Sequence, residues 1–146
     1  MTTTNAMLLT DSELRDLLVN SRVIAVVGHS HKTFRDSYAV GRYLRQAGYR
    51  VYAINPNIPS VDGEPAYPRL ADAPEGIDIV NVFRRPDALP QVVEDAIAVQ
   101  ARAIWTQLGV IHPQAEARAR AAGLITVVNR CLMVEHQRLG IQRLVP

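Results

Sequence analysis

Five short runs of apolar, largely β-branched residues recur along the chain, and stretches with helical periodicity separate most of them. An unbroken apolar run that ends at turn residues is typical of a strand buried on both faces of a parallel sheet. The strands are expected at residues 23–28, 49–55, 77–83, 101–107 and 124–128. Because strands that alternate with helices are joined by right-handed crossovers, the sequence predicts an α/β fold: a Rossmann-like three-layer sandwich, with an open parallel sheet of about five strands and helices on both faces.

The expected helices carry start signals in the sequence. Thr10 and Glu13 have the spacing of a capping box, which predicts a short helix in a leading segment over residues 1–20. Asp36 or Ser37 is expected to cap the helix that follows the first strand. Further helices are expected at residues 90–100, 113–122 and 131–139. Residues 56–76 are rich in proline and show no period, so we expect a long connection that packs over the sheet.

Length and composition favour one domain and argue against several classes of protein. A chain of 146 residues that is 48% hydrophobic can bury one sizeable core, so we expect a single domain over residues 1–146. No apolar run reaches the roughly eighteen residues of a membrane span, and the first residues do not resemble a secretory signal. A lone cysteine, Cys131, excludes an internal disulfide and fits a reducing compartment. We therefore expect a soluble, cytoplasmic protein with no membrane partner.

The basic residues do not form a nucleic-acid-binding patch. The sequence pI is near 9.0, but the net charge is only +2. The arginines are spread along the chain and Lys32 is the only lysine. Binding to nucleic acid is therefore not expected.

Polar or cationic residues follow most of the expected strands, and no carboxylate occurs among them before Asp36. In an open parallel sheet, ligands bind outside the carboxyl ends of the strands. The segments at these ends are Gly28-His29-Ser30-His31-Lys32-Thr33, Asn55-Pro56-Asn57, Phe83-Arg84-Arg85, Gln107-Leu108-Gly109 and Asn129-Arg130-Cys131. This composition predicts a site for an anion.

The loop after the first strand has the groups that bind phosphate. Gly28 allows close approach of the backbone, and Ser30, Thr33 and Ser37 supply hydroxyls beside the start of a helix. Arg35 can add a bidentate charged contact. We expect a pyrophosphate here; the alternative is that Ser37 only caps the helix and Arg35 is a solvated surface charge.

The dinucleotide and P-loop motifs are missing from this loop. Gly28 stands alone where NAD-binding proteins have G-x-G-x-x-G, and Asn55-Pro56 occupies the place of the ribose-binding acid. No G-x-x-x-x-G-K-[ST] occurs. NADP remains an alternative because arginines can hold its additional phosphate.

Four sequence blocks, taken in order, resemble the small stand-alone CoA-binding proteins, whose fold is similar to the CoA-binding domain of the succinyl-CoA synthetase α subunit. The blocks are VVGHSHKTFRDSYAVGRYLRQAGYRVYAINP, DIVNVFRRP, AIWTQLGV and AGLITVVNRCLMVE, and they lie within residues 20–140. The resemblance implies a Rossmann-like domain that binds coenzyme A or an acyl-CoA along the strand ends.

The resemblance also implies a set of binding residues. It places Gly28, Ser30, Lys32, Arg35 and Ser37 around the phosphates, Asn55 and Pro56 near the adenosine, Phe83 and Arg84 as walls of the nucleotide site, and Gln107, Gly109, Arg130 and Cys131 toward the pantetheine arm. The chain departs from the family pattern at three positions. The family often has a small residue in place of His29 and a proline near Asp36, and usually an aspartate in place of Asn81.

Histidine and cysteine residues in these loops allow other chemistry. His29 and His31, with Cys131, could hold a metal, but no C-x-x-C or H-E-x-x-H pattern supports one and no metal is expected. Cys131 beside Arg130, at a helix start, could favour a thiolate that forms a mixed disulfide with CoA. A small buried apolar cysteine is the commoner case and is favoured.

No catalytic residue is assigned from the sequence. In CoA ligases the resembling domain is joined to domains that supply a phosphorylated histidine and a nucleotide site, and this chain is too short to contain them. We expect a non-catalytic CoA or acyl-CoA binding protein that acts as a sensor, a carrier or the partner of an enzyme, and that could be a homo-oligomer. The alternatives are a small NADP-binding regulator or reductase, and an enzyme that acts on a CoA thioester with His29 or His31 as base.

Overall fold

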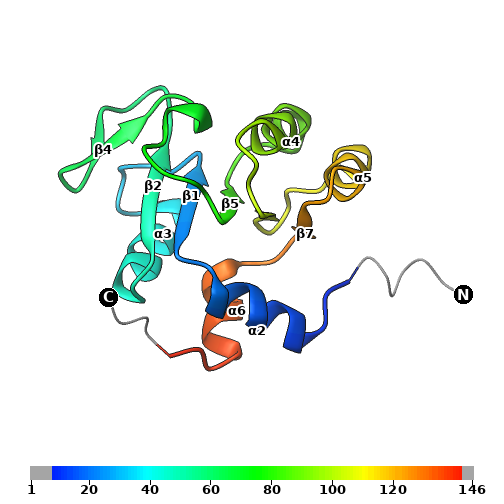
Figure 1. Ribbon diagram of the computed structural model, residues 1–146. Helices are drawn as coiled ribbons and strands as arrows, with labels where there is room; N and C mark the ends of the chain where they lie inside the picture. The colour runs from blue at the N-terminus through cyan, green and yellow to red at the C-terminus, as the bar shows by residue number, and fades with distance from the viewer. Residues whose placement is uncertain (1–7, 143–146) are drawn as a thin grey trace, which may run out of the picture.

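Residues 8–142 are described by a computed structural model, in which a seven-stranded sheet lies between two layers of helices (Figure 1). The strands are β1 (Val23–Val27), β2 (Arg50–Ile54), β3 (Ser60–Val61), β4 (Glu64–Tyr67), β5 (Ile79–Val82), β6 (Ala103–Thr106) and β7 (Ile125–Val127). The helices are α2 (Asp11–Asn20), α3 (Asp36–Gln46), α4 (Leu89–Ala98), α5 (Pro113–Ala121) and α6 (Leu132–Arg138), with the 3-10 turns η1 (Leu70–Asp72) and η2 (Pro86–Ala88). The predicted three-layer α/β fold is confirmed.

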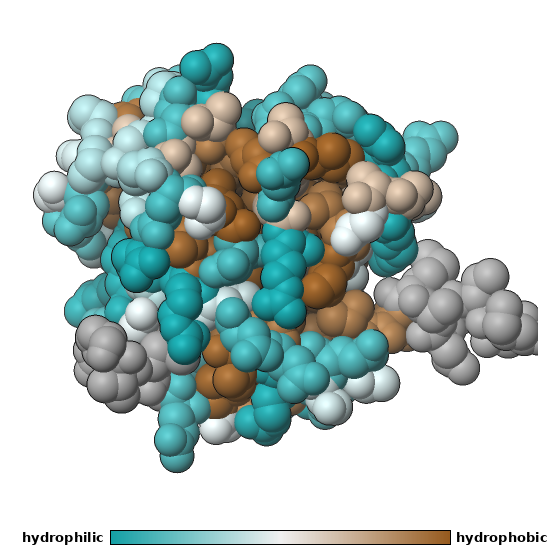
Figure 2. Space-filling view, in the orientation of Figure 1, coloured by the Kyte–Doolittle hydropathy of each residue, from teal (hydrophilic) through white to brown (hydrophobic). Residues whose placement is uncertain are grey.

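The core has two halves, one on each face of the sheet. Val23, Ala25 and Val27 of β1 pack with α4 and α5, whereas Ile24 and Val26 pack with α2, α3 and α6. All five residues of β1 are buried because this central strand is covered on both faces, which explains its unbroken apolar run. Figure 2 shows hydrophobic side chains gathered toward the middle of this face of the molecule, with mostly hydrophilic ones around them.

The order of the strands sets the place of the site. The order is β3-β4-β2-β1-β5-β6-β7, and all neighbouring pairs are parallel except β3 with β4. The chain runs outward from β1 through β2 on one side and returns to β5 on the other. The switch point of the sheet is therefore between β1 and β5, where ligands bind in open α/β sheets.

The predicted strand count was too low, because residues 56–76 contain two strands. β3 and β4 form an antiparallel hairpin, and β4 also pairs in parallel with β2, where Ala53 lies opposite Ala66. Asp62 and Gly63, with φ of 50° and 84°, form the turn between them. An Asp-Gly pair is a known hairpin signal. The strands are two and four residues long and are bordered or interrupted by Pro59 and Pro65, so they show no hydrophobic period.

One predicted helix cap is present and another is wrong. Thr10 and Glu13 form the expected capping box at the start of α2. For α3 the N-cap residue is Arg35, and no side chain caps this helix. Ser37 instead lies inside the first turn, and its hydroxyl oxygen accepts a hydrogen bond from the Ser30 N–H at 2.9 Å. In the described part of the chain, no helix is long and apolar enough to cross a membrane.

The capping box makes a prediction about stability. In Thr10→Ala, the hydrogen bond from the Glu13 N–H to the Thr10 hydroxyl oxygen is lost, while the bond from the Thr10 backbone N–H to the Glu13 carboxylate can remain. The free energy of unfolding should therefore fall by about 1 kcal/mol in urea denaturation. Ser12→Ala is the matched control, because this neighbouring side chain is exposed and takes no part in the box. Equal unfolding free energies for the two variants would contradict the assignment.

Candidate functional site

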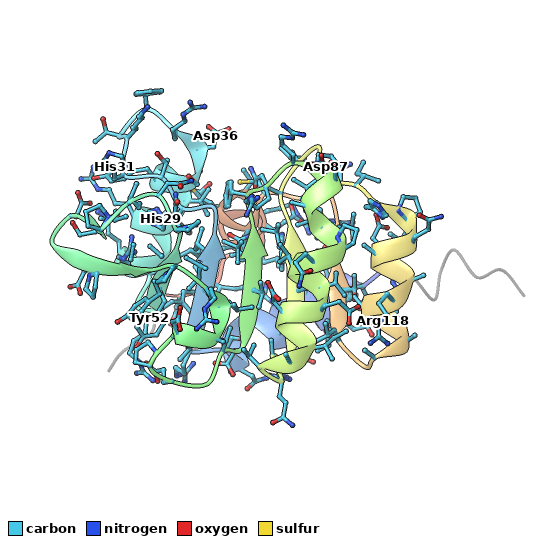
Figure 3. The ribbon with its side chains drawn as sticks, turned by 90° about the horizontal axis from the view of Figure 1, so that it is seen from above. His29, His31, Asp36, Tyr52, Asp87 and Arg118 are labelled. Carbon is cyan, nitrogen blue, oxygen red and sulfur yellow. The ribbon has the colours of Figure 1, made fainter. Side chains whose placement is uncertain are left out.

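A pocket of about 540 Å³ lies at the switch point between β1 and β5. Its first wall is the loop after β1 with the start of α3, and includes Gly28, Ser30 and Ser37. The segment after β5, from Phe83 to Arg85, forms a second side, and the segment after β6, from Gln107 to Val110, forms the third. In Figure 3, His31 of the first loop, Asp36 at the start of α3 and Asp87 after β5 lie in the upper part of the view. Tyr52 and Arg118 lie lower in the same view.

Glycine at position 28 is required for the first loop to cross the end of β5. Gly28 has a φ of +88°, and a Cβ there would lie 2.2 Å from the Phe83 carbonyl oxygen. Any side chain would therefore collide with the neighbouring strand and strain the backbone. The Gly28 N–H donates to the Ile54 carbonyl at 2.8 Å, and the Phe83 N–H donates to the Val27 carbonyl at 2.8 Å. The ends of three central strands are thus held together beneath the pocket.

Two serines hold the loop in shape. Ser37 accepts from the Ser30 N–H, and the Ser30 hydroxyl oxygen accepts from the Lys32 N–H at 3.0 Å. In this arrangement both hydroxyl oxygens act as acceptors, and a hydroxyl has one further proton to donate. The two serines can therefore stabilise the loop and still donate to an anion in the pocket.

His29 is fully buried and joins the loop to α3. Its Nδ1 lies 2.8 Å from the Ser30 carbonyl oxygen and its Nε2 lies 3.1 Å from an Arg45 guanidinium nitrogen. Since arginine can only donate, Nε2 is the acceptor and Nδ1 carries the proton. The ring packs on Gly41, where a Cβ would lie 2.2 Å from Nε2. Burial lowers the pKa of His29 to about 4.

This geometry corrects the alternatives that used His29 as a base or metal ligand. Both of its ring nitrogens are engaged inside the protein, while His31 is exposed. Within residues 8–142, no group of three or more histidine, cysteine or acidic side chains could hold a metal ion. His29 is instead a structural residue of the loop.

Asn55 and Pro56 lie at the end of β2 and have different surroundings. The Asn55 amide donates to the His29 carbonyl at 3.0 Å and accepts from the Asn57 N–H at 2.9 Å. Pro56 borders a second hollow of about 360 Å³ between the strand ends and α4, together with the apolar residues Leu70 and Val92. Arg84 borders both hollows, so they adjoin at its side chain.

The remaining sequence-predicted residues do not line the main pocket. Lys32 and Thr33 are exposed in the first loop, and Gly109 donates its N–H to Asn129 Oδ1 at 2.8 Å. Arg130 pairs with Glu135 at 2.9 Å. Cys131 is only 8% exposed and packs in the core half with α2, α3 and α6. This burial matches the interpretation of Cys131 as a small apolar residue.

The pocket has two unpaired cations. Arg35 and Arg84 are exposed and make no salt bridge within residues 8–142, whereas Arg85 pairs with Asp87 at 2.7 Å. Sequence reasoning did not select Arg85, Leu108 or Val110 as site residues. The strand-end rule did include Arg85 and Leu108 among the segments that follow the expected strands, but neither was selected as a binding residue.

The chain belongs to the CoA binding domain family, whose sequence profile matches residues 22–137. The uncharacterized protein YneT of Bacillus subtilis (strain 168) is 34% identical over 125 residues, which cover 86% of this chain and 93% of that protein. A hypothetical protein from Pyrococcus horikoshii OT3 has a similar structure, with 40% identity, a TM-score of 0.90, and coverage of 92% of this chain and 95% of that one.

A longer protein contains a related segment. Acetate--CoA ligase [ADP-forming] I of Archaeoglobus fulgidus is 30% identical over 74 residues, which span 51% of this chain but only 11% of the ligase. The matching region is thus a small part of that protein. The similarity therefore concerns one domain of the ligase and not its whole activity.

The burial of His29 predicts a dependence of stability on pH. Because its pKa is about 4 in the folded protein and about 6.5 when unfolded, the unfolded chain binds more protons between these values. The free energy of unfolding should be highest above pH 6.5 and should fall by about 3 kcal/mol from this group as the pH approaches 4. Urea denaturation across this range measures the effect.

Two variants separate His29 from the other titrating groups. His29→Gln should lose this part of the pH dependence, whereas His31→Gln, at an exposed histidine of the same loop, should keep it. His136, whose pKa is also lowered by burial, contributes equally to both variants. The same slope in His29→Gln and in the parent protein would show that His29 is not buried neutral.

Proposed function

We propose that this chain binds coenzyme A or an acyl-CoA in the pocket between β1 and β5, and acts without catalysis as a single-domain cytoplasmic sensor, carrier or enzyme partner. One observation carries this proposal: two arginines that have no acidic partner within residues 8–142, Arg35 and Arg84, border a pocket whose wall also includes the Gly28 turn and the serine-held loop. Membership of the CoA binding domain family supports the same ligand.

The phosphates of the ligand would lie against the start of α3. This helix has no side-chain cap, so the N–H groups of its first turn are suited to an anion, as is the positive end of the helix dipole. The hydroxyls of Ser30 and Ser37 can donate to the same oxygens, and Arg35 can pair with their charge. The helix N–H groups, the two hydroxyls and Arg35 thus favour a phosphate group at this position, whereas the Asp36 carboxylate, which also lines the pocket, opposes one.

The adenosine would occupy the second hollow, beside Pro56. Leu70 and Val92 give this hollow apolar walls, while Gln91 and Asp95 of α4 add polar groups at its border. Because Arg84 borders both hollows, one ligand can place its base in the second and its phosphates in the first. This division fits a nucleotide with several phosphates.

The surroundings of His29 support a binding role. An enzyme acting on the thioester would need an acid or base within reach of the ligand. His29 is 0% exposed and is bonded to Ser30 and Arg45, so it offers no free nitrogen to the pocket. His31, the other candidate base, is exposed and is not among the residues that line the pocket.

Titration calorimetry of the purified protein tests the proposed ligand. CoA should bind with a micromolar or lower dissociation constant, and at least about tenfold more tightly than NADP or ADP. Comparison of CoA with acetyl-CoA in the same buffer shows which form is preferred. Binding of NADP without binding of CoA would overturn the proposal and favour the NADP-binding alternative.

Removal of a single cation tests the phosphate site. Arg35→Ala should weaken CoA binding by roughly 1.5–3 kcal/mol, the usual range for a hydrogen bond to a charged group. Arg42→Ala is the matched control, because this exposed arginine of α3 does not line the pocket and its loss changes the net charge equally. Equal CoA affinities for the two variants would show that Arg35 does not contact the phosphates.

A further inference from the structure

A hollow of about 360 Å³, which we name the edge hollow, adjoins β7 at the edge of the sheet. Figure 1 shows β7 between α5 and α2, the two helices that contribute to its walls. Two further lining residues, Arg102 and Leu124, directly precede β6 and β7, so the hollow lies at the amino ends of these strands. It shares no lining residue with the pocket between β1 and β5, which lies at the carboxyl ends.

The sheet edge beside this hollow lacks the features that prevent association. At the opposite edge, β3 is only two residues long and follows Pro59, and both features hinder pairing with another chain. Residues 124–128, which contain β7, include neither proline nor a charged residue. Leu8, which borders this edge, is 57% exposed, and Val19 of α2 is 42% exposed. Apolar surface is therefore available around the edge hollow for contact with another molecule.

Charges of both signs line the edge hollow and do not pair with one another. Glu13 and Asp16 lie three residues apart on α2, so they share one face of that helix. Arg102 and Arg120 come from the segment before β6 and from α5. Within residues 8–142, the side chains of Asp16, Arg102 and Arg120 form no salt bridge. The hollow thus has an acidic wall and a basic wall that are separate.

The separation of these walls indicates the kind of partner. Elsewhere on the surface, Arg118 pairs with Glu94 at 2.9 Å and Arg50 pairs with Glu75 at 2.7 Å. The unpaired walls of the edge hollow fit a molecule that carries a basic and an acidic wall in the opposite order. A second copy of this chain has that arrangement, because in a two-fold dimer each patch meets the other patch of its partner.

We propose that the edge hollow is the interface of a homodimer, in which α2 of each copy lies against the arginines of the other. Asp16 of one copy pairs with Arg102 and Arg120 of the partner subunit, and the same pairs form in the other half of the interface. Leu8 and Val19 are removed from water by the same contact. The pocket between β1 and β5 stays open in both copies, so this inference does not depend on the proposed function.

Analytical ultracentrifugation of the purified protein tests the dimer. The mass should rise with protein concentration to twice the chain mass of 16.1 kDa. Asp16→Arg and Arg102→Glu should each raise the dimer dissociation constant by about tenfold or more, because like charges then face each other in both halves of the interface. Arg42→Glu, at an exposed arginine of α3 outside the hollow, is the control for the change in net charge and should leave the dimer intact.

A mixture of the two disruptive variants identifies the contact between copies. When one copy carries Asp16→Arg and the other carries Arg102→Glu, opposite charges meet again in both halves of the interface. The mixture should therefore dimerise nearly as well as the parent protein, although each variant alone is largely monomeric. Compensation within one chain cannot produce this result, because no chain carries both substitutions.

Urea denaturation at a concentration where the parent protein is monomeric checks that the variants fold. All three substitutions are at exposed side chains, so the free energies of unfolding should match that of the parent. A parent protein that stays monomeric at every concentration would overturn the proposal and leave the hollow to a protein of different sequence. A dimer that survives both charge reversals, or a mixture that stays monomeric, would also overturn it. None of these outcomes affects CoA binding, which calorimetry measures separately.

Discussion

The close contact between Gly28 and the Phe83 carbonyl is the constraint on which the site depends. The backbone of the first loop passes over the end of β5 where no Cβ can fit, because a Cβ would lie 2.2 Å from that oxygen. This approach lets the loop after β1 and the segment after β5 share one pocket at the switch point. It also places Arg35 and Arg84, which are far apart in the sequence, on neighbouring sides of that pocket.

The loop is held in this position by buried polar contacts on its inner side. His29 fills the space left by Gly41 on α3 and accepts a hydrogen bond from Arg45, while Asn55 donates to the His29 carbonyl. A neutral, buried histidine stabilises the loop without adding charge beneath the proposed phosphate position. The outer side of the loop is thereby left to serine hydroxyls and backbone N–H groups, which are the groups that phosphate requires.

Part of the site followed from general rules about parallel sheets. Gly28, Ser30, Arg35, Ser37, Phe83, Arg84 and Gln107 were predicted, and all of them line the pocket. Each lies directly after a strand or at the start of the following helix, so the strand-end rule applies to it. Arg130 and Cys131 also follow a strand, but β7 is at the edge of the sheet and the pocket is at the switch point between β1 and β5. Position in the sheet, which requires the strand order, thus explains why Arg130 and Cys131 lie away from the pocket; it does not explain Lys32, Thr33 and Gly109, which lie in loops that border the pocket but do not line it.

The sequence by itself determined the alternation of strands and helices, the leading capped helix and the chemical character of the first loop. These depend on periodicity, on capping between neighbours and on residue types within a few positions, all of which are local. Only the tertiary structure decided that Ser37 bonds to Ser30 rather than capping α3, that His29 is buried against Gly41, and that residues 56–76 add β3 and β4 to the sheet. Each of these depends on which segments lie side by side after folding. A hydrogen bond, or the space that a glycine leaves free, depends on which residues are neighbours in the folded chain. Such residues come together only when the sheet has formed.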